Sequence, residues 1–154
     1  MKAILLLSVL LLAACTQETT KPAPVPFNPA TVQPAIEGLN INFGKGIREK
    51  NAAIIAANYD QAAHLCPDND TYINGRTAIE NWWKESVNQL DDMTMTTISL
   101  EGSPDLLYET GMATTTVHIG DSIWVQNDKY VNVWKLQADS SYKIVVDIWN
   151  GIEK

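Results

Sequence analysis

The spacing of the apolar residues changes once along this chain, near Met93, and no other feature restricts the fold as strongly. Before Met93, apolar side chains recur every three or four residues, which is typical of amphipathic helices. After it, Thr-rich and β-branched runs alternate with turns of Gly, Asn, Asp and Ser, which is typical of strands. In one domain of 154 residues, helices followed by strands predict an α+β fold, with helices covering one face of a curved antiparallel sheet.

Three helices are expected before the change. The apolar spacing predicts the first over Pro29–Ile47, although Gly44 weakens it. Lys50–Tyr59 is expected to form a short second helix. The sequence Thr77-Ala78-Ile79-Glu80 has the form of a capping box, in which the first side chain caps the helix and the last reaches back to it, and it predicts a third helix to about Leu90.

Four strands are expected after the change, as an antiparallel meander. They are Thr94–Leu100, Leu106–Ile119, Ser122–Gln137 and Tyr142–Asn150. Gly120-Asp121 is typical of a hairpin turn. Because Asn and Asp tolerate left-handed backbone, Asn127-Asp128 predicts a bend in the third strand. A further turn is expected over Cys66–Asp70, with short extended pieces on either side.

The first 15 residues, MKAILLLSVLLLAAC, have the features of a bacterial lipoprotein signal peptide. Lys2 precedes an apolar run that is shorter than the roughly 20 residues of a membrane-spanning helix. Leu12-Ala13-Ala14-Cys15 resembles a lipobox, whose cysteine carries a diacylglyceryl group. We therefore expect a signal peptide over residues 1–14, lipidated Cys15 followed by a Pro- and Thr-rich tether to residue 30, and one domain over 31–154.

Such an anchor places the protein in the cell envelope, held at a membrane through its lipid alone. By resemblance to enterobacterial sorting, Thr16 in place of Asp favours the outer membrane if the host has one. The alternative is an ordinary signal peptide, or a short buried helix, with an incidental cysteine.

Charge and cysteine content restrict the partners. The net charge is −7 and no basic stripe is present, so nucleic acid is not an expected partner. The two histidines are isolated and Tyr72 interrupts the calcium-loop pattern that begins at Asp68, so neither a metal nor another cofactor is expected. Cys66, the second cysteine, is expected to be a small buried hydrophobe.

Four passages, in order and spacing, resemble the nuclear transport factor 2-like superfamily, which includes SnoaL-like cyclases, ketosteroid isomerase and limonene epoxide hydrolase. They are Tyr59 with Ala62-Ala63, similar to the end of the family's second helix; Gly75-Arg76-Thr77-Ala78-Ile79, similar to the entry to its third helix; Tyr108-Glu109-Thr110-Gly111, similar to a strand motif; and the closing hairpin with Lys129-Tyr130-Val131, Trp134-Lys135, Tyr142-Lys143-Ile144 and Asp147-Ile148-Trp149-Asn150. The likeness covers about residues 31–150 and is strongest to an uncharacterised branch of small ketosteroid-isomerase-like proteins.

The resemblance implies a cone-shaped fold, in which three N-terminal helices pack on the curved sheet and a deep pocket lies at the open end. It also implies a homodimer, because many members pair through the outer face of the sheet. In ketosteroid isomerase a general-base aspartate lies beyond the second helix. That place falls at Cys66-Pro67 here, with Asp68 one residue further, which argues against steroid isomerisation.

Two residues are candidates for acid–base chemistry. Asp147 lies inside an otherwise apolar strand, where a carboxylate must be paired, solvated or raised in pKa. In the epoxide hydrolases an aspartate in a similar last-strand motif lines the pocket and transfers protons. His64 is a second candidate base, because imidazole titrates near neutral pH. The alternatives are a structural, hydrogen-bonded Asp147 and a half-exposed His64.

Five aromatic side chains are candidate walls of a ligand pocket, although aromatics in small domains are also core residues. They are Trp83, Tyr108, Tyr130, Trp134 and Trp149. Three functions remain open: a module that binds a small apolar or amphipathic molecule, a cofactor-independent isomerase, hydrolase or cyclase that uses Asp147, and a dimerising assembly part of the envelope.

Overall fold

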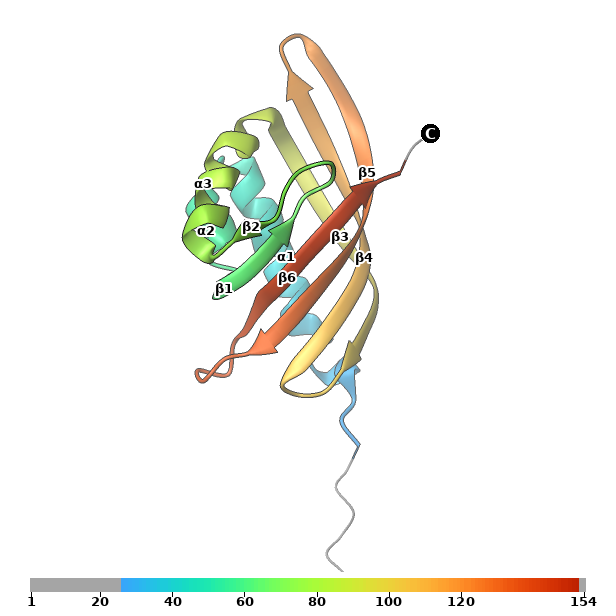
Figure 1. Cartoon of the computed structure of the whole chain (residues 1–154). Coiled ribbons are helices and arrows are strands. Elements are labelled where there is room, and N and C mark those ends of the chain that lie inside the picture. Colours follow the sequence, from blue (N-terminus) through green and yellow to red (C-terminus); the bar gives the residue numbers. More distant parts are fainter. Residues whose placement is uncertain (1–25, 153–154) are drawn as a thin grey trace, which may run out of the picture.

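The computed structural model describes residues 26–152, so the expected signal peptide, Cys15 and most of the tether lie outside the described residues. The described chain forms one six-stranded sheet in the order β2-β1-β6-β5-β4-β3, with the helices on its concave side (Figure 1). The strands are β1 Tyr59–Cys66, β2 Ile73–Asn74, β3 Leu90–Gly102, β4 Leu106–Ile119, β5 Ser122–Leu136 and β6 Tyr142–Gly151. The α+β architecture with a curved sheet is as predicted.

The first helix, α1, spans Gln33–Arg48 and follows a 3-10 turn, η1, at Pro29–Thr31. Gly44, which weakens the helix by propensity, lies where α1 crosses β3. A Cβ there would be 2.5 Å from the carbonyl oxygen of Met93, so only glycine allows this approach of helix to strand. Phe27 already packs against the core, so ordered structure begins before residue 31, inside the segment expected to be a tether.

The second helix is shorter than predicted and ends before Tyr59. α2 spans only Ala52–Ala56 and is capped by Asn51, whose side chain accepts from the backbone of the first turn. Tyr59 opens β1, so likening the Tyr59 passage to the end of a helix was wrong. Every buried position of β1 after Tyr59 belongs to Ala63, Leu65 or Cys66, and the strand pairs in parallel with β6, which fixes it as sheet.

The third helix, α3, spans Arg76–Ser86 and continues as a 3-10 turn, η2, at Val87–Gln89. Its N-cap is Gly75 at φ 85°, and no side chain caps it, so the predicted capping box at Thr77 is wrong. The amide of Gly75 instead donates to the carbonyl of Ala63 on β1. Because this bond fixes Gly75 as the N-cap, the helix begins at Arg76, earlier than the capping pattern at Thr77 indicates.

The four predicted strands are present as β3 to β6, and β1 and β2 extend the sheet beyond them. Asn127 and Asp128 stay in continuous register with β4 and neither has left-handed backbone, so no bulge interrupts β5 there. Among the described non-glycine residues, positive φ occurs at Lys50, Asn69 and Ser140, outside the strands.

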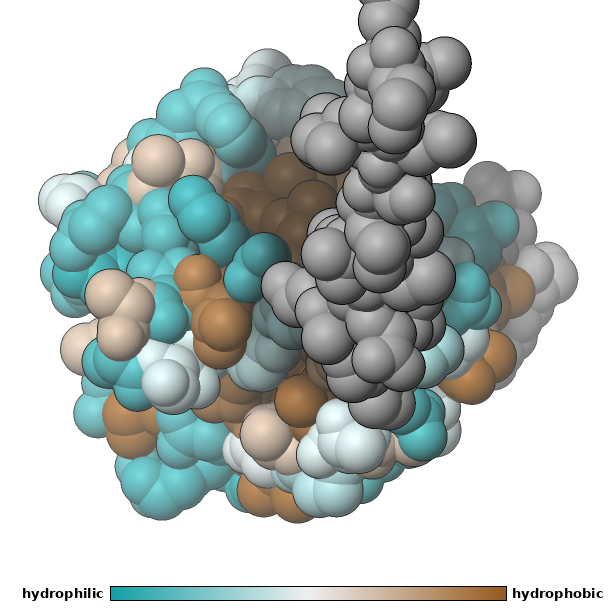
Figure 2. Space-filling view, turned by 90° about the horizontal axis from the view of Figure 1, so that it is seen from below, coloured by the Kyte–Doolittle hydropathy of each residue, from teal (hydrophilic) through white to brown (hydrophobic). Residues whose placement is uncertain are grey.

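The core lies between the helices and the concave face of the sheet. Seen from the end opposite the β4–β5 hairpin, apolar side chains occupy the centre and hydrophilic residues surround them (Figure 2). The fully buried set includes Ile36, Ile47, Ile55, Tyr59, Leu65, Ile79, Leu107, Trp134 and Ile144. Within residues 26–152, no helix has the length and apolar character needed to cross a bilayer.

Two glycines of α1 provide a matched test of this helix–sheet contact. Gly44→Ala places a methyl group against the Met93 carbonyl, and we expect a loss of about 1–3 kcal/mol in the free energy of unfolding. Gly38→Ala meets nothing within 4 Å, so it should stabilise by about 0.5–1 kcal/mol through helix propensity. Urea denaturation of the two variants measures the difference; equal effects would show that α1 does not approach β3 in this way.

Candidate ligand pocket

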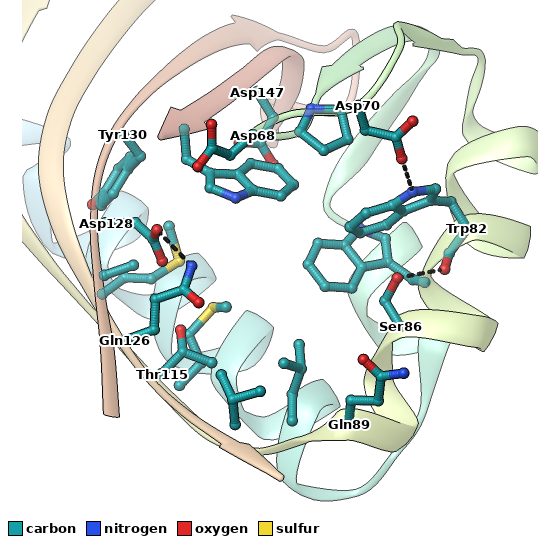
Figure 3. Close-up of a pocket in the computed structure, with 18 of the residues that line it drawn as sticks. Asp68, Asp70, Trp82, Ser86, Gln89, Thr115, Gln126, Asp128, Tyr130 and Asp147 are labelled. Carbon is teal, nitrogen blue, oxygen red and sulfur yellow. Dashed lines mark hydrogen bonds between the residues drawn. The ribbon is translucent and has the colours of Figure 1, made fainter. Parts of the chain in front are cut away.

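A cavity of about 470 Å³ lies between α3 and the concave face of β4, β5 and β6. Phe43 of α1 and the loop that follows β1 complete its wall, and Figure 3 shows Trp82 on one side facing Tyr130 and Asp128 on the other. The lining comprises Phe43, Pro67, Asp68, Asn69, Asp70, Trp82, Trp83, Ser86, Gln89, Leu90, Met93, Met95, Ala113, Thr115, Val117, Ile119, Trp124, Gln126, Asp128, Tyr130, Asp147 and Trp149.

Three tryptophans form the main aromatic wall. Trp82 and Trp83 meet edge to face with ring centroids 4.9 Å apart, and Trp149 stacks on Trp83 at 6.2 Å. Phe43 adds a further edge contact to Trp83 at 5.3 Å. Because each ring is fixed by its neighbours, the wall is rigid and largely preformed.

Asp147 of β6 lines the pocket and is only 5% exposed. The hydroxyl of Tyr59 donates to its Oδ2 at 2.5 Å, and the indole N–H of Trp83 donates to the same hydroxyl at 3.4 Å. Burial raises the pKa of Asp147 to about 7; the charge of Glu109 acts in the same direction and the Tyr59 bond opposes it. A carboxyl group that titrates near neutral pH therefore faces the cavity.

Glu109 of β4 is the second buried carboxylate and is 0% exposed. Its Oε1 accepts from Asn40 on α1 at 2.7 Å, from Thr97 on β3 at 2.6 Å and from Tyr130 on β5 at 2.8 Å. Its Oε2 accepts from Trp134 at 2.9 Å. Four donors thus satisfy the Glu109 carboxylate, and the carboxylate in turn holds Tyr130 in the pocket wall.

Gly111 makes room for Tyr130. A Cβ at Gly111 would lie 2.3 Å from the Tyr130 ring, so the ring crosses β4 where a side chain is absent. Glu109 and Gly111, both part of the Tyr108–Gly111 strand motif, therefore position Tyr130 together: Glu109 accepts its hydrogen bond and Gly111 leaves room for its ring. Burial and the neighbouring Glu109 charge raise the pKa of Tyr130 well above its ordinary value, so its hydroxyl remains a donor.

Glu109, Asn132 and Asp147 form a row across three neighbouring strands, because Asn132 is the register partner of both carboxylates. Asn132 is fully buried, and neither polar atom of its side chain has a partner within the described residues. The hydroxyl of Thr115, in the pocket wall, is also buried without a partner in that part of the chain.

Further acidic groups lie toward the mouth. Asp128 of β5 is 4% exposed and accepts from Gln126 at 2.9 Å. Burial raises its pKa, the nearby charge of Asp68 raises it further and Gln126 opposes this. Asp70, which is exposed, accepts from the indole N–H of Trp82 at 3.1 Å, and Figure 3 shows this bond at the rim.

The structure brings some of the sequence candidates together and separates others. Asp147, Trp83, Tyr130 and Trp149 line the pocket. Trp134 is buried behind the pocket wall, where its indole N–H donates to Glu109. Tyr108 is 42% exposed on the outer face of the sheet, where its hydroxyl donates to Glu101. His64 is exposed and meets Asn74 on β2 at 2.6 Å, so it does not join Asp147.

Several functional residues lie outside the sequence-based candidates, notably Trp82, Trp124, Thr115 and Asp128 in the pocket wall and Glu109 behind it. Strand alternation carries a signal for two of them, because Trp124 and Asp128 differ by even steps from the candidate Tyr130 and therefore share its face of β5. Glu109 was visible as a charge inside an apolar alternation, as Asp147 was. Trp82 follows Ile79 at the three-residue spacing of a helix face, a signal that the sequence-based prediction did not use.

Comparison with solved structures identifies the architecture. A ketosteroid isomerase-like protein from Erwinia carotovora atroseptica superposes with a TM-score of 0.70 at 12% identity, covering 80% of this chain and 98% of the other. A nuclear transport factor 2-like superfamily protein from Salmonella enterica gives 0.66 at 11% identity, covering 81% and 94%. This chain has the nuclear transport factor 2-like fold.

A third structure agrees with this assignment. A nuclear transport factor 2-like protein with a cystatin-like fold, from Novosphingobium aromaticivorans, gives a TM-score of 0.66 at 8% identity, covering 80% of this chain and 84% of the other. No protein-family model matches the sequence, and no curated protein matches it. At these identities the likeness concerns the fold alone, and a shared fold does not imply a shared function.

The raised pKa of Asp147 predicts a specific pH dependence of stability. An unfolded aspartate titrates at about 3.9, and Asp147 does so at about 7 in the fold, so the folded state binds more protons between these values. The free energy of unfolding should therefore fall as pH rises from about 4 to about 7, by a few kcal/mol, and then level off.

Asp147→Asn should remove this contribution, so that the stability of wild type relative to the variant declines over that pH range. Urea denaturation at steps from pH 4.5 to 8.5 measures it. Asp105→Asn, at an exposed turn, should follow the wild-type curve. Parallel curves for wild type and Asp147→Asn would show that Asp147 is ionised throughout.

Proposed function

We propose that this domain binds one small, mainly apolar or amphipathic molecule in the cavity between α3 and the sheet. The observation that carries the proposal is a cavity of about 470 Å³ whose walls are preformed tryptophan and methionine side chains with a few polar groups among them. Ligand pockets of proteins have typical volumes of about 300–1,000 Å³ and this mixture of surfaces.

The arrangement of the polar groups supports binding in one orientation. Asp147 and Tyr130 line the cavity as buried groups, whereas Asp68 is exposed at its mouth and lies close enough to Asp128 for its charge to raise the pKa of that group. A ligand with an apolar body in the interior and a polar group toward the mouth would find matching surfaces in both regions. The likeness to a ketosteroid isomerase-like protein is consistent with a small, largely apolar ligand in a pocket of this fold.

Filling the cavity tests the proposal. N-phenyl-1-naphthylamine, a neutral dye that fluoresces in apolar surroundings, should bind the wild-type protein. Ala113→Leu adds three carbons inside the cavity and should weaken dye binding at least about tenfold, since the lost volume cannot be recovered in a packed wall. Thr116→Leu adds the same side chain to the other face of β4 and should bind the dye as wild type does. Equal affinities for all three proteins would place the dye elsewhere.

A second candidate function is proton transfer by Asp147, favoured by one observation, its pKa of about 7 at the cavity wall. A group with this pKa both accepts and donates a proton at neutral pH. The Tyr59 hydroxyl at 2.5 Å would stabilise the charged form during transfer.

Native mass spectrometry of the purified protein would identify a co-purifying molecule, and deuterium uptake into that molecule in D2O would report proton abstraction. Asp147→Asn should reduce the exchange rate at least about a hundredfold while binding persists. His64→Asn should leave the rate unchanged, because His64 lies on the outer side of β1, away from the cavity. Undiminished exchange in Asp147→Asn would remove Asp147 from the mechanism.

For the whole chain, we propose that Cys15 is lipidated and holds the pocket domain at a membrane of the cell envelope. The support is the sequence of the first 15 residues. Intact-mass measurement of the purified protein tests it, because a diacylglyceryl-modified N-terminal Cys15 has a distinct mass that Cys15→Ser lacks.

Self-association through the sheet is also proposed. The convex face exposes apolar side chains on adjacent strands, with Val131 of β5 in register with Ile148 of β6, 37% and 42% exposed. Sedimentation equilibrium would show a dimer that Val131→Lys dissociates, and a monomeric wild type would exclude it.

A further inference from the structure

All charged residues that line the pocket are acidic. They are Asp68, Asp70, Asp128 and Asp147, and within residues 26–152 no Lys, Arg or His side chain belongs to the lining. A pocket of this composition repels anions and gains from a positive charge placed inside it.

These carboxylates lack a cationic partner in the described part of the chain. The ion pairs found there use Glu49, Glu80, Asp91 and Asp92, all away from the cavity. Asp68 accepts only from the amide of Gly151, and Asp128 from the neutral side chain of Gln126. Two neighbouring acids at the mouth, one of them 4% exposed, therefore remain uncompensated.

The surfaces beside the carboxylates are aromatic faces and edges. Trp82 of α3 and Trp149 of β6 lie 5.9 Å apart, centroid to centroid, and Tyr130, the register partner of Trp149, and Trp124 also line the cavity from the sheet. Aromatic rings attract an organic cation electrostatically while they pack against its carbon atoms. Figure 3 shows Trp82 on α3 facing Asp128 and Tyr130 on β5 across the open cavity.

An independent observation marks the same cavity as a binding site. Thr115 is 3% exposed and its hydroxyl has no hydrogen-bond partner in the described chain, although it belongs to the pocket wall. A buried polar group without a partner costs about 1–3 kcal/mol, a loss that a polar ligand atom or an ordered water removes. Thr115 lies on the same face of β4 as Ala113, the register partner of Asp128, so this hydroxyl is close to the acidic mouth.

A bare metal ion does not match these groups. Among residues 26–152, no three His, Cys, Asp or Glu side chains lie close enough together to hold one. The carboxylates are instead spread over a cavity that is much larger than an ion and has tryptophan walls. The charge that fits is one carried on a molecule with an apolar body.

We propose that the pocket selects an organic cation, in which an amine or quaternary ammonium group near Asp68 and Asp128 is joined to an apolar body packed on the tryptophans. This inference rests on the proposed binding function and adds the charge of the ligand to it. Cation–π contact and two carboxylates together should favour a monocation over an uncharged molecule of the same shape.

Three probes of one shape and different charge provide the test: benzyltrimethylammonium, its uncharged carbon isostere neopentylbenzene, and the anion phenylmethanesulfonate. Each competes with N-phenyl-1-naphthylamine for the full chain carrying Cys15→Ser, so that no acyl chain competes for the pocket. We expect the cation to bind about tenfold more tightly than the isostere and the anion to bind most weakly.

Two variants assign the preference to the pocket. Asp68→Asn/Asp128→Asn keeps the shape of both side chains and should abolish the advantage of the cation over neopentylbenzene. It should leave the affinity for neopentylbenzene itself within about twofold, because the apolar contacts are unchanged. The matched control Asp105→Asn removes an exposed carboxylate at the turn between β3 and β4 and should behave as wild type.

The outcomes separate this inference from the proposed function. If neopentylbenzene binds as tightly as the cation in wild type, or if the double variant keeps the preference, the cation inference is overturned and the apolar pocket stands. If the dye binds but the three probes do not displace it, the cation inference again fails. If the dye does not bind either, both fail.

Discussion

The fold depends on satisfying Glu109 and Asp147, two of the carboxylates that it buries. Glu109 joins the helix layer to the sheet, because its four donors come from α1, β3 and β5. A buried carboxylate without such donors would destabilise the protein by several kcal/mol, so these contacts bind the two layers together. Asp147 is treated differently: it has one short bond from Tyr59 and a pKa near 7. One carboxylate is therefore structural, and the other remains chemically available.

This division of roles shapes the pocket. Tyr130 is fixed by Glu109 behind it and passes over Gly111, so its ring forms a permanent wall. Trp83 is fixed between Phe43, Trp82 and Trp149. Glu109 holds Tyr130 from behind the wall, whereas the rings that fix Trp83 line the cavity together with it. The carboxylates of Asp128 and Asp147 are polar groups set among these fixed rings. Because the side chains of such a site are already fixed, a ligand need not order them on binding. More of the contact free energy therefore appears as affinity.

How far the sequence predicted this structure can be judged from particular elements. The strands β3 to β6 and the helix α1 follow from periodicity, because each buries one face of a regular element. The sequence predicted only short extended pieces on either side of the Cys66–Asp70 turn and assigned Tyr59 to a helix, because the alternation in Tyr59–Cys66 is weak and its partner, β6, lies some 80 residues later in the chain. The start of α3 was misplaced because a hydrogen bond from Gly75 to β1 outweighs the local capping pattern.

The residues of the candidate site likewise divide into those that local patterns predict and those that depend on contacts between distant segments. Asp147, Trp83, Tyr130 and Trp149 were found because they interrupt or enrich a periodic segment, and the structure places all four in the wall. His64 was proposed for its chemistry alone, and its strand directs it outward. The mouth, with Asp68 and Asp128, depends on bringing a loop against the sheet through the Gly151 amide, which no local pattern records.

The strand order has a consequence for how the protein forms. β6 is the last strand of the chain, yet it lies between β1 and β5 and is the parallel partner of β1. During synthesis, β1 can therefore join the main sheet only after the residues beyond 140, which form β6, have been made. Such long-range closure slows folding, and until it occurs the apolar faces of α1 and β1 remain exposed. A truncation that removes β6 from Ile144 onward would therefore also remove the strand that joins β1 to the rest of the sheet.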